Sequence, residues 1–306
     1  MDGIILVAKP ALKTSHDVVL ELRRILRIGK IGHFGTLDPM ATGVLIAACG
    51  RAARLFPYYS RHDKAYRGRI RLGFSTDTYD AQGKPTSQPA DRLPEEDELR
   101  AAMASFLGSL NQVPPAYSAK KFKGKPLYRL ARNAEPVPLK PSPVVVHALK
   151  LESYAPPDFD ISVRCSGGTY IRSLAHDIGL KLGCGGHLLE LVRTAVGPYT
   201  LDRCSSLERI RTLAEAEAIG SFLLPLEALL PDFPKLILTE KGERCAKNGN
   251  SILPEHILSA ETPGPPAGSQ AEDEALFRLF GPGGRFIALA RRAPDKAVLQ
   301  PILVFN

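Results

Sequence analysis

The sequence predicts an α+β protein of two domains, a larger one over residues 1–231 and a small β-barrel over residues 232–306. Three observations support this division. The 306 residues are about two domains' worth at roughly 150 residues per domain. Alternating and helical hydrophobic patterns occur together before residue 231, which is typical of a mixed, mainly antiparallel sheet with helices. Three prolines lie within 225–234, and mostly short strands follow them.

The first half of the chain contains the clearest secondary-structure signals. Gly3–Val7 is predicted to form a buried strand, and apolar residues at helical spacing predict a helix over 16–26, with Thr14 and Asp17 as a weak capping box. Residues 65–74 alternate, so we expect a strand with one apolar face and one face of arginines at 67, 69 and 71. A helix should begin after Pro94, where acidic residues favour a helix N-terminus.

Periodicity fails over residues 112–143 and returns afterwards. We expect strands near 144–154 and 160–165 and a helix over 170–182, introduced by two glycines. Beyond residue 234 the pattern predicts a short strand, a helix near 240–246, a loop rich in proline and glycine over 262–268, and final strands over 285–291 and 296–305.

Composition excludes several classes of protein. Hydrophobic residues make up 44% and charged residues 24%, which are ordinary values for a globular chain. No run approaches the roughly 18 apolar residues of a membrane span. Asp2 stands where a signal peptide would carry a basic residue. The five cysteines are scattered, with no C-x-x-C pair, which argues against a disulfide framework. We therefore expect a cytoplasmic protein.

The charge distribution indicates a polyanionic partner. The formal net charge is +8, and residues 232–306 contain nine basic and nine acidic side chains, so the whole excess lies in residues 1–231. Seven basic residues and one acidic residue fall between Lys120 and Lys140. Because this run also contains Phe122 and Tyr128, it is typical of a nucleic-acid contact, in which lysines meet phosphates and rings stack on bases. A merely basic, solvated surface is the alternative.

One carboxylate stands out in the segment Gly32–Leu45. Glycines and small residues surround Asp38, and Pro39 restricts its backbone to extended conformations. The segment is neither a P-loop nor a dinucleotide-binding fingerprint. Composition alone favours a structural turn here over a catalytic carboxylate.

A second candidate is Arg172, which is predicted to lie in the first turn of a helix. A positive charge opposes the helix dipole there. Either an anion faces this guanidinium or the arginine is simply exposed, and the two interpretations stand equal at this point. Sequence patterns of zinc proteases and serine hydrolases are absent.

In combination, these segments resemble the TruB family of tRNA pseudouridine synthases, which isomerise uridine 55 in the T loop. The resemblance covers nearly the whole chain. The segments that carry it are, in order, Lys9-Pro10 with Ser15, residues 32–45, Lys64-Ala65-Tyr66, residues 76–83, residues 168–174, Cys184–His187 and Leu191-Val192-Arg193.

The resemblance implies a catalytic domain of the pseudouridine synthase type and a C-terminal PUA-like RNA-binding barrel. It makes Asp38 the catalytic carboxylate, Arg172 its partner and Tyr66 the ring that stacks on the target base. The substrate-binding positions are His33, Lys64, Tyr66, Tyr170 and Leu191. Residues 112–143 match an insertion that clamps the T arm of tRNA, with Lys120, Lys121, Phe122, Lys123 and Lys125 as its RNA contacts.

The chemistry implied is an isomerisation without a redox step or group donor, so we expect no cofactor and no metal, and a monomer that acts on tRNA. Two alternatives stay open. A non-catalytic RNA-binding or RNA-folding protein would need the basic insertion but not Asp38. A guide-RNA-dependent synthase would carry extra basic tails and lack the insertion.

Overall fold

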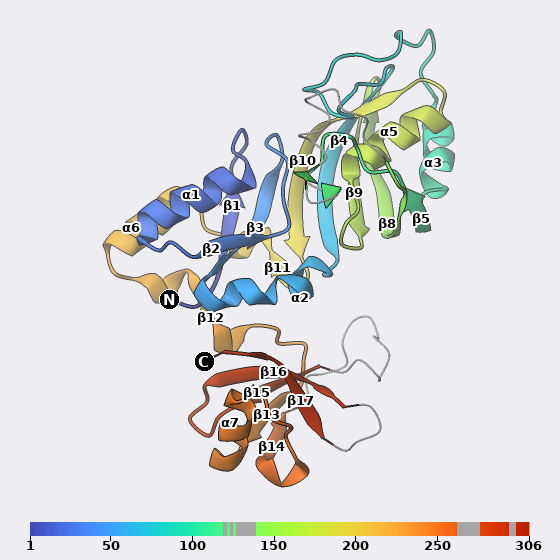
Figure 1. Ribbon diagram of the computed structural model, residues 1–306. Helices are drawn as coiled ribbons and strands as arrows, with labels where there is room; N and C mark the ends of the chain where they lie inside the picture. The colour runs from blue at the N-terminus through green and yellow to red at the C-terminus, as the bar shows by residue number, and fades with distance from the viewer. Residues whose placement is uncertain (119–120, 123–124, 127–138, 262–275, 294–297, 306) are drawn as a thin grey trace. The chain divides into compact units, whose positions relative to one another are not determined.

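The computed structural model describes residues 1–118, 121–122, 125–126, 139–261, 276–293 and 298–305 (Figure 1). The chain divides into two compact units. The larger contains Leu6–Ala47 and Leu55–Phe222, and the smaller contains Met1–Ile5, Ala48–Arg54 and Leu223–Asn306. In the described ranges no helix is long and apolar enough to cross a membrane.

The main sheet is mixed and mainly antiparallel. Its strand order is β12-β1-β3-β10-β4-β9-β8-β5. β3 and β10 pair in parallel, whereas β4, β9, β8 and β5 continue from β10 as antiparallel neighbours. The strands are β1 (Gly3–Lys9), β3 (Thr42–Cys49), β4 (Lys64–Leu72), β5 (Gly108–Gln112), β8 (Ser142–Ala155), β9 (Asp158–Cys165), β10 (Gly186–Val196) and β12 (Leu223–Pro225). The sequence-based prediction of an α+β chain with such a sheet is confirmed.

Two helices cover one face of this sheet (Figure 1). They are α3 (Glu96–Ala104) and α5 (Ile171–Lys181). Leu99 and Met103 of α3 and Leu174 and Ile178 of α5 pack against strand residues such as Ile161 in one buried cluster. Burying apolar side chains of this size contributes about 1.5–3 kcal/mol each. This packing sets the position of α5, whose first turn carries Arg172.

Helix α1 (Ser15–Leu26) begins as predicted. Thr14 is its N-cap, the Thr14 hydroxyl accepts from the Asp17 N–H, and the Asp17 carboxylate accepts from the Thr14 N–H. Val18, Val19 and Leu22 form the buried face. Among its described residues, this unit also contains helices α2 (Phe56–Ser60) and α6 (Leu207–Glu215) and the short strands β2 (Ile31–Phe34), β6 (Lys121–Phe122), β7 (Lys125–Pro126) and β11 (Tyr199–Thr200).

The predicted arginine face of β4 is partly neutralised by acidic residues. Arg69 and Arg71 form ion pairs of 2.8 Å and 2.7 Å with Asp160 and Asp158 on the neighbouring strand β9. The acidic residues on β9 therefore neutralise two of the three arginines. This pairing depends on strand register, which the alternation within 65–74 alone does not reveal.

The smaller unit contains a second sheet, of order β14-β13-β15-β16-β17, and the helix α7 (Glu240–Lys247). Its strands are β13 (Lys235–Leu238), β14 (Ile257–Glu261), β15 (Leu276–Phe280), β16 (Phe286–Arg292) and β17 (Leu299–Val304). Within the described part of this unit, the strand pairing runs from β14 to β17 without closing. A PUA-like barrel therefore stays a prediction, and the predicted loop at 262–268 lies outside the described residues.

Candidate active site

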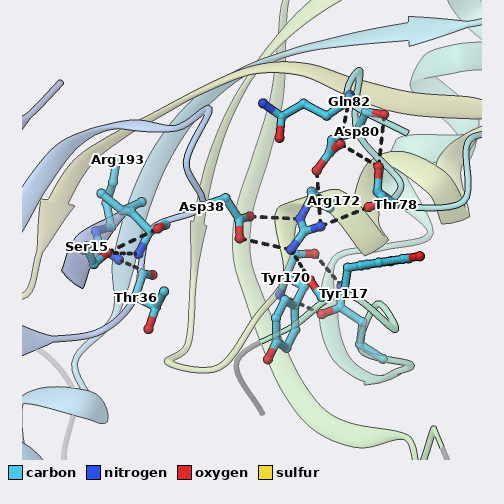
Figure 2. Close-up of polar contacts among 12 residues, drawn as sticks. Ser15, Thr36, Asp38, Thr78, Asp80, Gln82, Tyr117, Tyr170, Arg172 and Arg193 are labelled. Atoms are coloured by element: carbon cyan, nitrogen blue, oxygen red, sulfur yellow. Dashed lines mark hydrogen bonds and ion pairs between the residues drawn. The ribbon is translucent and has the colours of Figure 1, made fainter. Parts of the chain in front are cut away.

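An ion pair between Asp38 and Arg172 lies at the centre of the site (Figure 2). Arg172 Nη2 donates a 3.0 Å hydrogen bond to Asp38 Oδ1. Arg172 Nε lies 2.9 Å from Asp38 Oδ2, an ion-pair contact whose N–H is not aligned for a hydrogen bond. The Arg172 side chain is 5% exposed, whereas that of Asp38 is 32% exposed. The carboxylate is therefore held by a buried cation and still reaches solvent.

Arg172 also binds three other acceptors. Its Nη1 atom donates to the Thr78 carbonyl at 3.0 Å and to Asp80 Oδ2 at 3.2 Å. Its Nη2 atom donates to the Tyr117 carbonyl at 2.9 Å. Because these acceptors surround the guanidinium, it has little freedom to leave Asp38.

The turn that carries Asp38 is fixed from two sides. The Ser15 hydroxyl accepts from the Leu37 N–H at 2.8 Å and donates to the Leu37 carbonyl at 3.2 Å. Arg193, which is 1% exposed, donates to the carbonyls of Gly35 and Thr36 at 3.1 Å and 3.3 Å. Figure 2 shows Asp38 between these contacts and the Arg172 cluster. The turn is therefore built before substrate arrives.

Glycine is required at one position beside this turn. Gly43 has φ +108° and pairs with Arg193 across β3 and β10. A Cβ atom at Gly43 would lie 2.2 Å from the Arg193 carbonyl oxygen. Only glycine permits this approach, which places Arg193 beneath the turn.

Burial and charge act in opposite directions on Asp38. Partial burial raises the pKa of the Asp38 carboxyl, and the Arg172 guanidinium lowers that pKa. The negative charge of Asp80 adds to the increase, while Lys9 opposes it. The adjacent cation favours the ionised acid, but burial has the larger effect, so the Asp38 carboxylate becomes protonated more readily than a free aspartate.

Tyr66 lies close enough to Asp38 for the two side chains to interact electrostatically. It is on β4, 7% exposed, in the same buried cluster as Leu37 and Leu191. Burial raises the pKa of Tyr66 to about 12, so the phenol is neutral at physiological pH. The structure thus brings together Asp38, Arg172, Tyr66 and Leu191 through direct contacts or a shared cluster.

The other predicted substrate residues have different surroundings. His33 lies on β2 with a buried Nδ1 atom that lacks a partner among the described residues. Lys64 Nζ donates to the carbonyls of Ser60 and His62, so its ammonium group is bound by backbone acceptors of the protein. Tyr170 is the N-cap residue of α5.

The predicted RNA-clamp residues fall in a segment that the structure describes only in part. Lys120 and Lys123 lie outside the described residues. Lys121 and Phe122 form β6, and Lys125 begins β7, which pairs with β6.

Sequence reasoning missed Asp80, Ser15 as a brace, and the role of Arg193. Asp80 lies in a polar turn, where carboxylates are common for local reasons. Thr78 Oγ1 and the Gln82 N–H bond to it locally. Its contact with Arg172 spans 92 residues, so no local signal could have shown it.

The arrangement suits acid–base or nucleophilic chemistry by a carboxylate. Among the described residues no group of three or more histidine, cysteine, aspartate or glutamate side chains could hold a metal.

The comparisons with known proteins show the family of the chain. Residues 23–171 match the N-terminal domain model of TruB family pseudouridylate synthases, and residues 172–231 match the C-terminal domain model of tRNA pseudouridylate synthase B. A tRNA pseudouridine synthase B from Solibacter usitatus is 44% identical over 82% of this chain and 86% of its own. One from Thermotoga maritima is 38% identical over 98% and 93%.

Solved structures show the same fold. A chain of an H/ACA RNP bound to a substrate RNA containing 2'-deoxyuridine superposes with a TM-score of 0.73 at 22% identity, covering 99% of this chain and 85% of that one. A chain of an archaeal box H/ACA sRNP complex gives the same score at 24% identity, covering 99% and 86%. With the family models and the relatives in agreement over most of the sequence, the chain belongs to the TruB family of pseudouridylate synthases.

Proposed function

We propose that this protein converts uridine 55 in the T loop of tRNA to pseudouridine, with Asp38 as the catalytic carboxylate. The observation that carries the proposal is the Asp38–Arg172 ion pair. In this pair a buried guanidinium holds a partly exposed carboxylate, and the turn that carries the carboxylate is itself fixed by hydrogen bonds. Relatives that are 44% and 42% identical to this chain are named tRNA pseudouridine synthase B. A non-catalytic RNA-binding protein would have no use for this pair.

The reaction breaks the bond between ribose C1' and uracil N1 and forms one between C1' and C5. The proton lost from C5 leaves to a base or to solvent, and N1 gains a proton, so the step needs no oxidant or group donor. Asp38 serves either as a nucleophile or as a base in this sequence. Tyr66, kept neutral by burial, offers a ring on which the uracil stacks once it has left the T-loop stack, which costs a few kcal/mol.

We propose that the remaining predicted residues position the RNA. His33, Lys64, Tyr170 and Leu191 line or support the uridine pocket. Residues 112–143 clamp the T arm, and residues 232–306 form a PUA-like module that binds RNA outside the T loop. The protein acts as a monomer in the cytoplasm under this proposal.

The test measures tritium release from an unmodified tRNA transcript labelled at C5 of uridine. Wild-type protein should release one tritium per tRNA, and a transcript with cytidine at position 55 should release none. Asp38→Asn keeps the side-chain shape and removes the charge, so turnover should fall to background while tRNA binding persists. An Asp38→Asn protein that still forms pseudouridine would overturn the assignment.

A further inference from the structure

The first residues of the insertion are docked against the active site. Gln112 and Ser118 are 5% and 3% exposed, and Pro114 and Pro115 between them are also buried. The segment Gln112–Ser118 therefore belongs to the packed domain, although its sequence has no helical or strand periodicity. It begins at Gln112, the last residue of β5, and leads to the predicted RNA contacts.

Gln112 bonds to the backbone at the start of α5 as a neighbouring strand would. Its Nε2 atom donates to the Tyr170 carbonyl at 3.0 Å, and its Oε1 atom accepts from the Tyr170 N–H at 2.8 Å. No side chain caps α5 at Tyr170 itself. The Gln112 amide therefore fixes the point where the chain enters this helix, two residues before Arg172.

Two further hydrogen bonds connect the same segments. Ser173 Oγ donates to the Val113 carbonyl at 2.8 Å. Arg172 Nη2 donates to the Tyr117 carbonyl at 2.9 Å, and the same nitrogen donates to Asp38 at 3.0 Å. One nitrogen atom is thus shared between the catalytic carboxylate and the start of the insertion. Figure 2 shows Tyr117 and Tyr170 beside this shared guanidinium.

We propose that Gln112 is a positioning residue for the reaction: it locks segment 112–118 onto the start of α5 and thereby holds Arg172 against Asp38. The inference rests on the proposed function and deepens it. It makes the insertion part of the catalytic geometry as well as an RNA contact, because any displacement of its first residues moves an acceptor of Arg172.

The test compares Gln112→Met with wild-type protein. Methionine keeps the volume and removes both hydrogen bonds to Tyr170. At saturating tRNA, kcat should fall about tenfold or more, since small misplacements of catalytic groups have effects of this size. The KM for tRNA should change little, because binding is spread over many phosphates.

A second readout does not need turnover. The pKa of Asp38 is measured by a carbon-13 carboxyl NMR titration, assigned with Asp38→Asn. The charged groups facing this carboxyl are Arg172 on α5, Asp80 in the loop between β4 and α3, and Lys9 at the end of β1. A looser Arg172 should raise the Asp38 pKa in Gln112→Met, and the acid limb of the pH–rate profile should shift in the same direction.

Gln300→Met is the matched control. Gln300 also donates its amide to a backbone carbonyl, that of Gly249 at 2.8 Å, in the smaller unit. Its loss should lower thermal stability without changing kcat or the Asp38 pKa. If Gln112→Met does not fold, Ser173→Ala serves instead, because it removes the hydrogen bond to the Val113 carbonyl. This variant should lower kcat and raise the Asp38 pKa in the same way, but by less than Gln112→Met.

An unchanged Asp38 pKa and kcat in Gln112→Met, or shifts no larger than those of Gln300→Met, would overturn the inference. Failure of the proposed function is distinguishable, because wild-type protein would then release no tritium while the NMR comparison still reports on Gln112.

Discussion

At the scale of single residues, the site depends on the protonation state of Asp38. Burial raises the pKa of this carboxyl above its ordinary value of 3.8. We predict that the rate of pseudouridine formation falls as pH drops through this raised pKa, at a pH higher than a free aspartate would give. A pH series of single-turnover rates measures the midpoint.

The sign of the linkage separates this effect from unfolding. Because the folded state holds the Asp38 proton more tightly than the unfolded chain, protonation of this group stabilises the fold. Loss of rate on the acid side should therefore precede any loss of circular dichroism signal. A midpoint at or below that of a free aspartate would contradict the prediction.

Leu12 offers a residue-scale test of stability. It has φ +65° and is 83% exposed, and its N–H donates to the Pro39 carbonyl at 2.8 Å. The left-handed conformation costs a non-glycine residue about 1–2 kcal/mol, and the extra freedom of an unfolded glycine offsets about 0.4–1 kcal/mol of that. We predict that Leu12→Gly raises the free energy of unfolding by about 0.5–1 kcal/mol, as measured by urea denaturation.

Leu12→Ala is its control, because alanine keeps the Cβ atom and the strain. Equal stability of the two variants would show that the conformation carries no cost.

The residue scale also shows what sequence reasoning could reach. Asp38 was singled out by its neighbours Gly35 and Pro39, yet composition alone favoured a turn. Its pairing with Arg172 joins positions 134 residues apart, and Gln112 and Asp80 act through contacts that span 58 and 92 residues. The sequence identified Asp38 and Arg172 as candidates, but which residues they contact depends on the tertiary fold.

At the scale of elements, local signals were reliable, and the buried strand predicted at Gly3–Val7 is confirmed as β1, but the central buried strand β3 was missed. The predicted capping box of α1 is present, because capping and helical spacing are encoded within one or two turns. In contrast, β3 (Thr42–Cys49) is buried along almost its entire length. A strand buried on both faces shows no alternation, so the same residues appeared only as a continuation of the glycine-rich segment.

The close parallel pairing of β3 and β10 at Gly43 provides an element-scale prediction. Gly43→Ala places a Cβ atom 2.2 Å from the Arg193 carbonyl oxygen at φ +108°, so the two strands must separate or distort. We expect a loss of roughly 3 kcal/mol or more in the free energy of unfolding, together with reduced activity as Arg193 moves away from the turn. Chemical denaturation and the tritium assay measure the two effects.

Gly32→Ala is the matched control, since no atom lies within 4 Å of its added Cβ and its φ is not positive. A loss of stability in Gly32→Ala as large as that in Gly43→Ala would show that the segment tolerates no side chain for another reason.

At the scale of the whole molecule, we expect positive charge to contribute most of the affinity for tRNA. The excess over residues 1–231 predicts tRNA affinity that falls steeply with salt, with a slope of about −0.7 to −0.9 in log K per log salt for each phosphate neutralised. Alanine at Lys120, Lys121, Lys123 and Lys125 should weaken binding and flatten the slope. Filter binding between roughly 50 and 200 mM salt measures it.

Arg69→Ala and Arg71→Ala give the contrast, because both side chains already pair with acidic residues on β9. They should leave the slope nearly unchanged. If the arginine substitutions flatten the salt slope as much as the lysine substitutions do, the assignment of RNA contacts to the insertion is contradicted.

The composition of the smaller unit has a consequence for synthesis on the ribosome. Gly3–Ile5 pair with Leu223–Pro225, so one edge of the first strand has no partner until the chain is almost three-quarters made. At about 5–20 residues per second, this wait lasts roughly 10–40 s. An unpaired strand edge invites association with other chains. We therefore expect nascent chains that stop before residue 223 to aggregate or to recruit chaperones, and we expect release from the chaperone to coincide with synthesis of the last quarter of the sequence.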